Sequence, residues 1–250
     1  MSWIEHLPKT RKLILAWEAP TSVKNRTRWA IGELVEQENS NFAFRYYMDK
    51  EFEALNQGRS RSDLPAAGYL GYPAFSSTNS GAWITGEVVD TFKRRLLRSD
   101  RPDYGSYLSH FRIPALATPS TMTLLGLTQA RLPSDGFSLV DPLDAEWSQC
   151  DLILEAAGFR HYKSELPTCE PGSPVNLVAD PMAGEDPHAV KMQIQGKTLG
   201  YVNRLQSTAV HAWLESRVIS THLLRINGST ERPRPYLFVS IREIERSKAA

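Results

Sequence analysis

The sequence predicts an α+β fold in two domains: a small sheet covered by helices at residues 10–148, and a small β-barrel with one or two helices at residues 149–246. Three observations predict it. The length of 250 residues exceeds that of one ordinary domain. Short apolar or alternating runs typical of strands occur in both parts, whereas helical spacing is concentrated mid-chain. A hydrophobic content of 41% is enough to bury a core.

The N-terminal part begins with three predicted strands. The apolar run KLILAW, residues 12–17, is typical of a buried strand. Two further strands are predicted at residues 29–37 and 42–48, and the turn-forming residues 38–41 between them indicate a meander. Residues 56–86 are rich in Gly, Pro and Ser and show no sustained period, so we expect a loop there.

Helices are predicted next, and we expect them to cover the first sheet. From Glu87, apolar residues recur at helical spacing with basic residues between them, and Pro102 ends this helix. A second helix is expected at residues 103–111. A third is expected to begin at Thr118-Pro119, which are suited to the N-cap and the first turn.

The C-terminal part is predicted to contain six strands and one helix, a content typical of a small barrel or a strongly curled sheet. Residues 132–144, ahead of it, are expected to form a turn, a short strand and an exit bounded by proline. Gln195-Gly196 is typical of a tight hairpin turn, and the helix is expected at residues 205–215. The six strands are expected at residues 152–154, 175–178, 189–194, 198–202, 219–226 and 236–241.

Composition and charge exclude several classes of protein. The 29 Lys and Arg against 28 Asp and Glu leave a net charge of +1, so affinity for nucleic acid must come from a local patch. Two cysteines, Cys150 and Cys169, are too few for a disulfide framework or a four-cysteine zinc site. The start lacks a signal-peptide pattern, and no apolar run is long enough for a membrane span. We therefore expect a cytoplasmic protein without a membrane partner.

The sequence motifs of common enzymes are absent. It contains no G-x-S-x-G, Walker loop, HExxH, GxGxxG or CxxC, and the six histidines are too scattered for a zinc site. We therefore expect a binding protein that is not an enzyme and has no metal or cofactor. An enzyme that acts on nucleic acid or nucleotides remains an alternative, because the carboxylates of Asp180, Glu185 and Asp186 lie within seven residues and could hold Mg²⁺.

Three pieces of the C-terminal part carry a family resemblance. They are GFRHY at residues 158–162, LVADPMAGEDPHAVKM at 177–192 and LGYVNR at 199–204. Their order and spacing resemble the HIRAN family, whose members in some SWI/SNF-type helicases bind the end of a single DNA strand. The resemblance implies a small β-barrel that recognises single-stranded DNA or a 3′ end, in a bacterial repair, mobile-element or defence system.

The chemistry of these residues fits an end-binding track. Asp186, in a Gly-Glu-Asp-Pro turn, is expected to accept a hydrogen bond from a terminal hydroxyl and to repel a phosphate; alternatively, it only forms an Asx turn. Basic side chains are expected to contact the next phosphates, and flat rings to stack on unpaired bases. The predicted site residues are Arg160, His161, Tyr162, Lys163, Asp186, Lys191, Tyr201 and Arg204.

Other predicted site residues also have structural alternatives. Tyr162 and Tyr201 lie in strand-like contexts, so they are alternatively aromatics at the rim of the core with only their hydroxyls exposed. Arg160 alternatively pairs with Glu155 or Glu165 on a solvated face.

The N-terminal half carries a fainter resemblance, to the small N-terminal subdomain of HipA-type kinases. It rests on the predicted strands around residues 32–34 and 44–46, a Pro-rich loop, and the helical segment at 91–104. The kinase core of that family has no counterpart here. The resemblance implies a second hypothesis, a non-catalytic regulatory module that docks a protein partner.

A basic cluster lies along the predicted helix that starts at Glu87 and ends at Pro102. It is the densest positive segment of the sequence, and we interpret it either as an extension of the nucleic-acid track or as the solvated face of an amphipathic helix. Its members are Lys93, Arg94, Arg95, Arg98 and Arg101.

Overall fold

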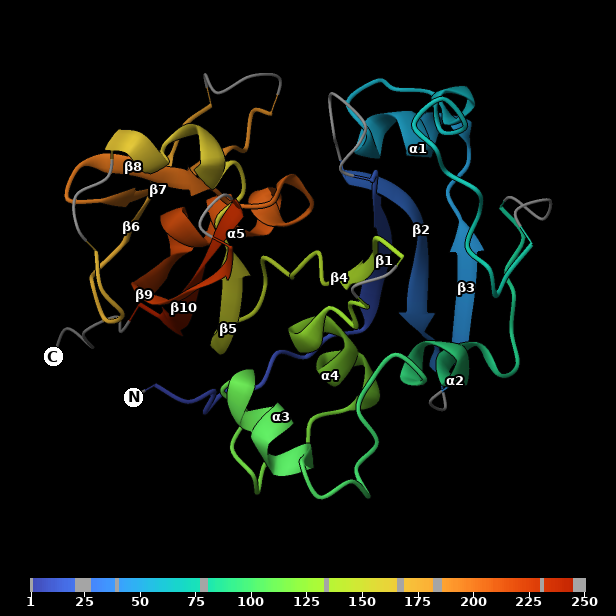
Figure 1. Cartoon of the computed structure of the whole chain (residues 1–250), viewed down its shortest axis with the longest axis horizontal. Helices are drawn as coiled ribbons and strands as arrows, with labels where there is room; N and C mark the ends of the chain where they lie inside the picture. Colours follow the sequence, from blue (N-terminus) through green and yellow to red (C-terminus); the bar gives the residue numbers. More distant parts are fainter. Residues whose placement is uncertain are drawn as a thin grey trace, which may run out of the picture. The chain divides into compact units, whose positions relative to one another are not determined.

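The computed structural model forms two compact units (Figure 1). It describes residues 2–20, 28–38, 41–76, 81–132, 135–165, 169–181, 186–229 and 232–244. The N-terminal unit comprises Thr10–Tyr107 and Thr118–Pro142, and the C-terminal unit comprises Met1–Lys9, Leu108–Ala117 and Leu143–Ala250. No sequence pattern assigned the two short segments to the C-terminal unit. The domain boundaries 10–148 and 149–246 stay a prediction about independent folding.

A four-stranded antiparallel sheet in the order β3-β2-β1-β4 organises the N-terminal unit. Its strands are β1 (Lys12–Glu18), β2 (Arg28–Glu36), β3 (Phe42–Tyr46) and β4 (Phe137–Val140). The predicted positions of these four strands are confirmed. Their apolar runs are largely buried, because helices and the irregular segment before α2 cover the sheet.

Among the described residues, four α-helices lie along the first 130 positions of the chain. They are α1 (Asp49–Leu55), α2 (Val88–Lys93), α3 (Tyr104–His110) and α4 (Thr121–Thr128). Helix α1 was not predicted, because Phe52 is its single buried residue and leaves no apolar period to detect. Helix α2 ends well before Pro102. Helix α4 begins later than expected, since Ser120, not Thr118, is the N-cap and its Oγ accepts from the Thr123 N–H at 3.1 Å.

Aromatic side chains from the irregular segment complete the core of the N-terminal unit. The rings of Phe44 and Phe75 stack with centroids 5.0 Å apart, and Tyr72 lies 4.9 Å from Phe137 and 5.6 Å from Phe92. The predicted loop at 56–86 is therefore irregular but packed, and its described residues include the short 3-10 helix η2 (Arg61–Asp63). Such ring pairs add to the stability that burial provides.

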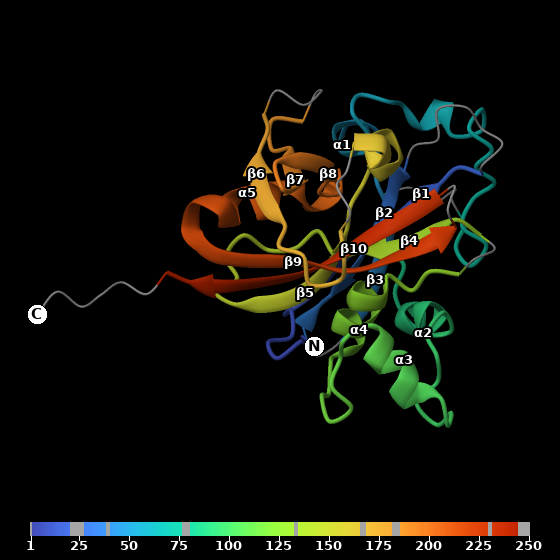
Figure 2. The ribbon, with the colours of Figure 1, turned by 60° about the vertical axis from the view of Figure 1, so that its left-hand side comes forward.

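The C-terminal unit contains two three-stranded antiparallel sheets, β5-β10-β9 and β6-β7-β8. Figure 2 shows β6, β7 and β8 on one side of the first sheet. All six predicted strands are confirmed. Their bounds are β5 (Cys150–Glu155), β6 (Asn176–Ala179), β7 (Val190–Ile194), β8 (Lys197–Tyr201), β9 (Arg217–Ser229) and β10 (Arg232–Glu243).

The two sheets are joined edge to edge at both sides, which gives the unit a barrel-like closure. One isolated bridge connects Ala157, just after β5, to Tyr201 at the end of β8. The other connects Pro174, just before β6, to His222 in β9. Because these joints are single bridges, the arrangement among the described residues is two curled sheets and not a closed, continuously hydrogen-bonded barrel.

The joint at Ala157 requires glycine at position 200. Gly200 has φ +152°, and a Cβ there would lie 2.5 Å from the carbonyl oxygen of Ala157. We expect Gly200→Ala to lower the free energy of unfolding by about 1–3 kcal/mol, the range for overpacking a filled site, as measured by urea denaturation. Gly105→Ala is the control, because a Cβ there meets nothing within 4 Å. Equal stability of the two variants would contradict this requirement.

Helix α5 (Arg204–Ser216) confirms the predicted C-terminal helix and contacts β6, β7 and β9. Asn203 caps it by accepting the Leu205 N–H at 3.1 Å. Its Trp213 is fully buried and donates from Nε1 to the Asp144 carbonyl oxygen at 3.1 Å. None of the described helices is long and apolar enough to cross a lipid bilayer.

Candidate functional site

The predicted site residues meet at one end of the β6-β7-β8 sheet, where β6 ends, β7 begins and β8 ends. Asp180 directly follows β6, and its N–H donates to the Ala189 carbonyl at 2.8 Å. The Ala189 N–H in turn donates to the Asp186 carbonyl at 3.1 Å. Two carboxylate-bearing residues therefore lie at the same end of the sheet.

A row of side chains crosses the outer face of this sheet. The strand register aligns Val178, Lys191 and Tyr201 on neighbouring strands. Their sequence neighbours Val190 and Met192 are buried, so the row faces outward. Val178 is exposed and Lys191 is partly exposed, which leaves this face open to a ligand.

Asp180 ties two members of the row together. Its Oδ2 lies 3.0 Å from the Lys191 Nζ and accepts a hydrogen bond from the Tyr201 hydroxyl, also at 3.0 Å. These two interactions hold the pKa of Asp180 below its ordinary value. The pKa of Tyr201 is raised, first by burial and then by its hydrogen bond to Asp180, so Tyr201 remains the donor.

The coupling predicts how Asp180 titrates. Lys191→Met should raise the pKa of Asp180 most and Tyr201→Phe less, because the lysine contributes the larger stabilisation of the carboxylate. Because the pKa of Asp180 is lower in the folded than in the unfolded protein, its carboxylate stabilises the fold at pH values above the pKa of the unfolded state. This contribution is lost as the pH falls through the pKa of the folded state. Carboxyl chemical shifts measured by NMR against pH test this, with Tyr162→Phe as the control. An unchanged titration in Lys191→Met would contradict it.

Tyr162 places a second aromatic ring beside Tyr201. The two ring centroids are 6.2 Å apart at an interplanar angle of 50°. Tyr162 follows the 3-10 helix η4 (Phe159–His161), which begins after Gly158 at φ 75° and is anchored by the buried Phe159. Both tyrosine rings are partly exposed, so they are neither wholly in the core nor wholly in solvent.

Arg160, His161 and Lys163 lie beside the tyrosines and are exposed. The Arg160 Nε donates to the His161 Nε2 at 3.1 Å. The predicted alternative pairing with Glu155 does not form, because the Glu155 Oε1 lies 3.8 Å from the Arg234 Nη1 instead. The side chain of Glu165 lies outside the described residues.

Asp186 forms the Asx turn that its sequence position predicts. Its Oδ1 accepts the His188 N–H at 2.9 Å, and its Oδ2 accepts the Ser207 hydroxyl at 2.8 Å. Ser207 lies in the first turn of α5, which Arg204 begins, so the aspartate is fixed next to this arginine in the fold. A carboxylate has about four acceptor positions, so these two bonds leave capacity for a ligand hydroxyl.

Sequence reasoning missed two contributors to the site. Asp180 was considered only as a metal ligand, and Ser207 was not considered. The alternation of β6 and β7 is the signal that places Val178 and Lys191 on the outer face, but nothing in the sequence shows that Asp180 turns back toward them. Among the described residues, no cluster of three His, Cys, Asp or Glu side chains is arranged to hold a metal ion. Glu185, part of the Mg²⁺ alternative, lies outside them.

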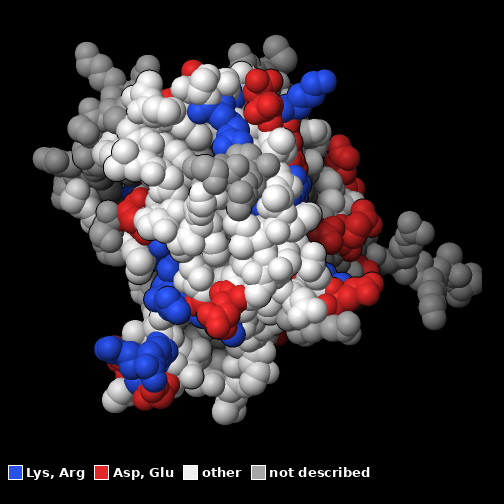
Figure 3. All heavy atoms as spheres, turned by 90° about the vertical axis from the view of Figure 1, so that its right-hand side faces the viewer, with Lys and Arg blue, Asp and Glu red and all other residues white. Residues whose placement is uncertain are grey.

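The basic cluster of the N-terminal unit is largely paired with acids. Lys93 pairs with Asp90, and the guanidiniums of Arg98 and Arg101 each bond two oxygens, of Asp100 and Asp103 respectively. On the face in Figure 3, basic and acidic side chains lie next to one another instead of forming a field of one sign. This arrangement favours the solvated-face interpretation.

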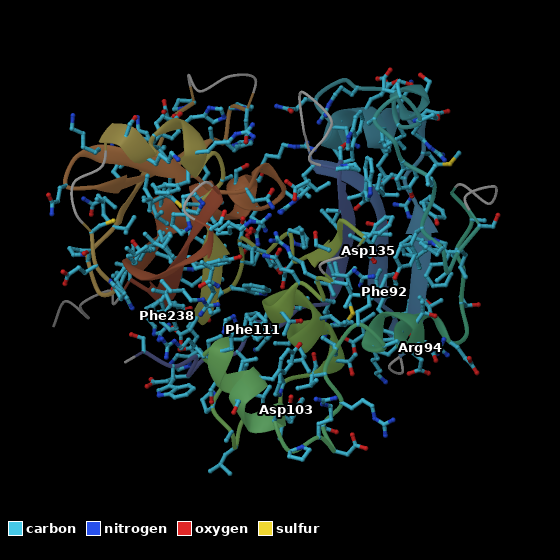
Figure 4. All side chains as sticks on the ribbon, in the orientation of Figure 1. Phe92, Arg94, Asp103, Phe111, Asp135 and Phe238 are labelled. Atoms are coloured by element: carbon cyan, nitrogen blue, oxygen red, sulfur yellow. The ribbon has the colours of Figure 1, made fainter. Side chains whose placement is uncertain are left out.

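Arg95 does not belong to the predicted basic patch. Its side chain is 7% exposed, and it bonds both Asp135 oxygens, at 2.6 and 3.1 Å. It also donates to the carbonyls of Ala130 and Phe137. Figure 4 labels Asp135 and Phe92 near the sheet, and also Arg94, which is exposed. Arg95 is therefore a buried structural residue, because its donors are used inside the unit.

No protein-family model and no curated protein matches the chain. Among solved structures, the chain is similar to the crystal structure of the HIRAN domain of human HLTF, with 17% sequence identity and a TM-score of 0.33. The alignment covers 38% of this chain and 78% of that chain. This likeness is weak and concerns the HIRAN resemblance alone. The resemblance to HipA-type kinases finds no support in the comparisons.

Proposed function

We propose that the C-terminal unit binds single-stranded DNA, including its 3′ end, on the outer face of the β6-β7-β8 sheet. One observation carries the proposal: the partly exposed rings of Tyr162 and Tyr201 lie together, with the Lys191 ammonium in the same cross-strand row. Flat rings for bases beside cations for phosphates are the combination that single strands require.

The surroundings of the two rings extend the proposed track. Arg160 and Lys163 are exposed on the short helices beside Tyr162, where they are available to phosphates. Lys191 is held by Asp180, which fixes its position and partly neutralises it. Stacking is tolerant of base identity, so we expect little sequence preference. The bacterial repair, mobile-element or defence setting stays a prediction from the resemblance.

Asp186 supplies the proposed recognition of the strand end. Two hydrogen bonds hold its carboxylate in place, and its remaining acceptor positions suit a terminal hydroxyl. A terminal phosphate at the same place would be repelled, because like charges at hydrogen-bond distance are unfavourable. Arg204, which begins α5 near this carboxylate, is the proposed contact to the next phosphate.

A binding titration tests the function. Fluorescence anisotropy compares labelled single strands ending in a 3′ hydroxyl, the same strands ending in a 3′ phosphate, and duplexes. We expect the hydroxyl-ended single strand to bind tightest, with an affinity that falls as salt rises, by a log–log slope of about −0.7 for each phosphate contacted. Equal binding of duplex and single strand, or binding independent of salt, would contradict the proposal.

Two aspartate variants separate end recognition from general charge. Asp186→Asn should abolish the preference for a 3′ hydroxyl over a 3′ phosphate, because the repulsion is removed while the amide oxygen can still accept. Asp180→Asn is the matched control: it removes a charge at the same end of the sheet, and should change affinity for both strands alike. If Asp186→Asn keeps the preference, the aspartate has only its structural role in the Asx turn.

A second candidate function is docking of a protein partner by the N-terminal unit. The observation that favours it is exposed apolar surface, with Leu70 99%, Met48 45% and Trp83 45% exposed. Affinity capture with nuclease present tests it. A partner held by the natural chain and lost with Leu70→Ser supports docking, whereas capture that disappears with nuclease alone assigns the association to nucleic acid.

A further inference from the structure

Four basic side chains converge in the C-terminal unit, outside the proposed DNA interface. His110 and Arg112 come from the segment Leu108–Ala117, and His222 and Arg225 come from β9. In Figure 4, the labelled Phe111 and Phe238 mark the two histidines, because their rings lie 5.1 Å from the His110 ring and 5.4 Å from the His222 ring. We refer to these four residues as the cationic cluster.

Arg225 is the centre of the cluster. Its guanidinium lies over the Tyr236 ring, 5.1 Å from the centroid, and its Nη1 donates to the His110 carbonyl at 2.8 Å. Its Nη2 lies 3.3 Å from the His110 Nε2. A guanidinium has no acceptor, so the His110 Nε2 can only be the acceptor in this contact, and the lowered pKa of His110 favours the neutral ring that such a contact requires. The arginine is thus fixed by a ring and a histidine and not by an acid.

Both arginines keep an unused donor. The Nε of Arg112 and the Nε of Arg225 are shielded from solvent and have no hydrogen-bond partner in the described part of the chain. Unpaired buried donors of charged groups are costly, and native structures pair nearly all such groups. The described residues therefore leave part of the donor capacity of both guanidiniums unused.

The cluster also has no compensating negative charge. Within the described ranges, no carboxylate lies at ion-pair distance from Arg112 or Arg225. Glu155 lies in the same cross-strand row as Tyr236 and Arg225, and its Oε1 is 3.8 Å from the Arg234 Nη1. Burial and the charge of Arg112 lower the pKa of Arg225, and burial together with nearby positive charge lowers the pKa of both histidines.

We propose that the cationic cluster is a binding site for a phosphate group, held between the guanidiniums of Arg112 and Arg225 with His110 as the residue that gains a proton when the anion binds. A tetrahedral oxyanion offers several acceptors to planar guanidinium forks. His110 is exposed, which gives a ligand access from solvent. The site does not depend on the proposed DNA interface, because its residues come from the other sheet and from the segment Leu108–Ala117.

Inorganic phosphate is the first probe. Titrated into the full chain at constant ionic strength against chloride, it should raise the melting temperature progressively, as linkage requires for a ligand that binds only the folded state. It should also raise the pKa of His110, which is followed from its ring proton signals by NMR. Arg112→Gln and Arg225→Gln should lose both effects. Lys197→Gln, which removes an exposed cation at the β7–β8 turn, should keep both.

Arg225→Lys is a second variant for the case that Arg225→Gln does not fold. It keeps the positive charge but removes the planar guanidinium, so we expect a folded protein whose melting temperature rises less with phosphate. No shift in the natural chain, or an equal shift in Arg112→Gln and Arg225→Gln, overturns the proposal. A single-stranded oligonucleotide in place of phosphate identifies the source: if it moves the His110 signals and displaces phosphate, the group is a nucleic-acid backbone phosphate, and otherwise it is a small phosphate compound.

Discussion

Tyr201→Ala is expected to weaken the binding of single-stranded DNA by about 1–3 kcal/mol, or roughly five- to 150-fold, the range for the loss of one stacked base. The same range applies to Tyr162→Ala, since the two rings form one pair with centroids 6.2 Å apart. If both rings contact successive bases, the double variant should lose less than the sum, because neighbouring contacts are not independent.

The conservative variant separates stacking from hydrogen bonding at the same position. Tyr201→Phe keeps the ring and loses only the hydroxyl bond to Asp180, so its affinity should fall much less than that of Tyr201→Ala. Tyr104→Ala is the matched control, because Tyr104 and Tyr107 form a comparable ring pair on α3, with centroids 6.0 Å apart. Anisotropy titrations at fixed salt give the comparison. A Tyr201→Ala protein that is folded and binds like the Tyr104→Ala control would remove the stacking surface from the proposal.

The elements of the C-terminal unit were predictable because its strands contain apolar or alternating runs that turn residues separate, although β9 and β10 extend beyond the runs that predicted them. The two-residue turn was equally clear, and Gln195 and Gly196 take the positive φ values, 47° and 77°, that a tight hairpin requires. The cross-strand partners were not predictable. Counting back from the turn pairs Lys191 with Gly200, but a bulge between Met192 and Gln193 shifts the partner to Tyr201.

That one-residue shift decides the composition of the site. In the simple register, Lys191 would have a glycine as its neighbour on the next strand, whereas the bulge brings the lysine and the tyrosine into one row. The cationic cluster was hidden for a different reason: its two halves are separated by most of the second half of the chain, and neither half is basic enough to stand out. Long-range contacts of this kind leave no local periodicity to read.

The basic cluster that begins at the end of α2 shows a different limit of sequence-based prediction. Its local pattern is strong, but its residues lie in different environments. Arg94 and Arg95 are adjacent and chemically identical, yet Arg94 is exposed and the Arg95 side chain is 7% exposed. Sequence periodicity alone did not separate them, because the partner of Arg95 is Asp135, which lies in the turn before β4. Burial and partner, and not residue type, determine what each arginine does.

We therefore expect Arg95→Ala to lower the free energy of unfolding by about 3 kcal/mol, the lower part of the range for breaking a buried ion pair from one side. The loss has two sources: the Asp135 carboxylate is left without its partner, and the Ala130 and Phe137 carbonyls lose their donor. Urea denaturation followed by circular dichroism measures it.

Arg94→Ala on the same turn of chain is the matched control for this prediction, with an expected change within about 0.5 kcal/mol, as for an exposed residue away from any buried network. A double variant, Arg95→Ala with Asp135→Ala, should cost less than the two single changes added together, because each single change leaves one charge unpaired. Equal stability of Arg94→Ala and Arg95→Ala would mean that the ion pair contributes nothing, and would return Arg95 to the set of residues available to phosphates.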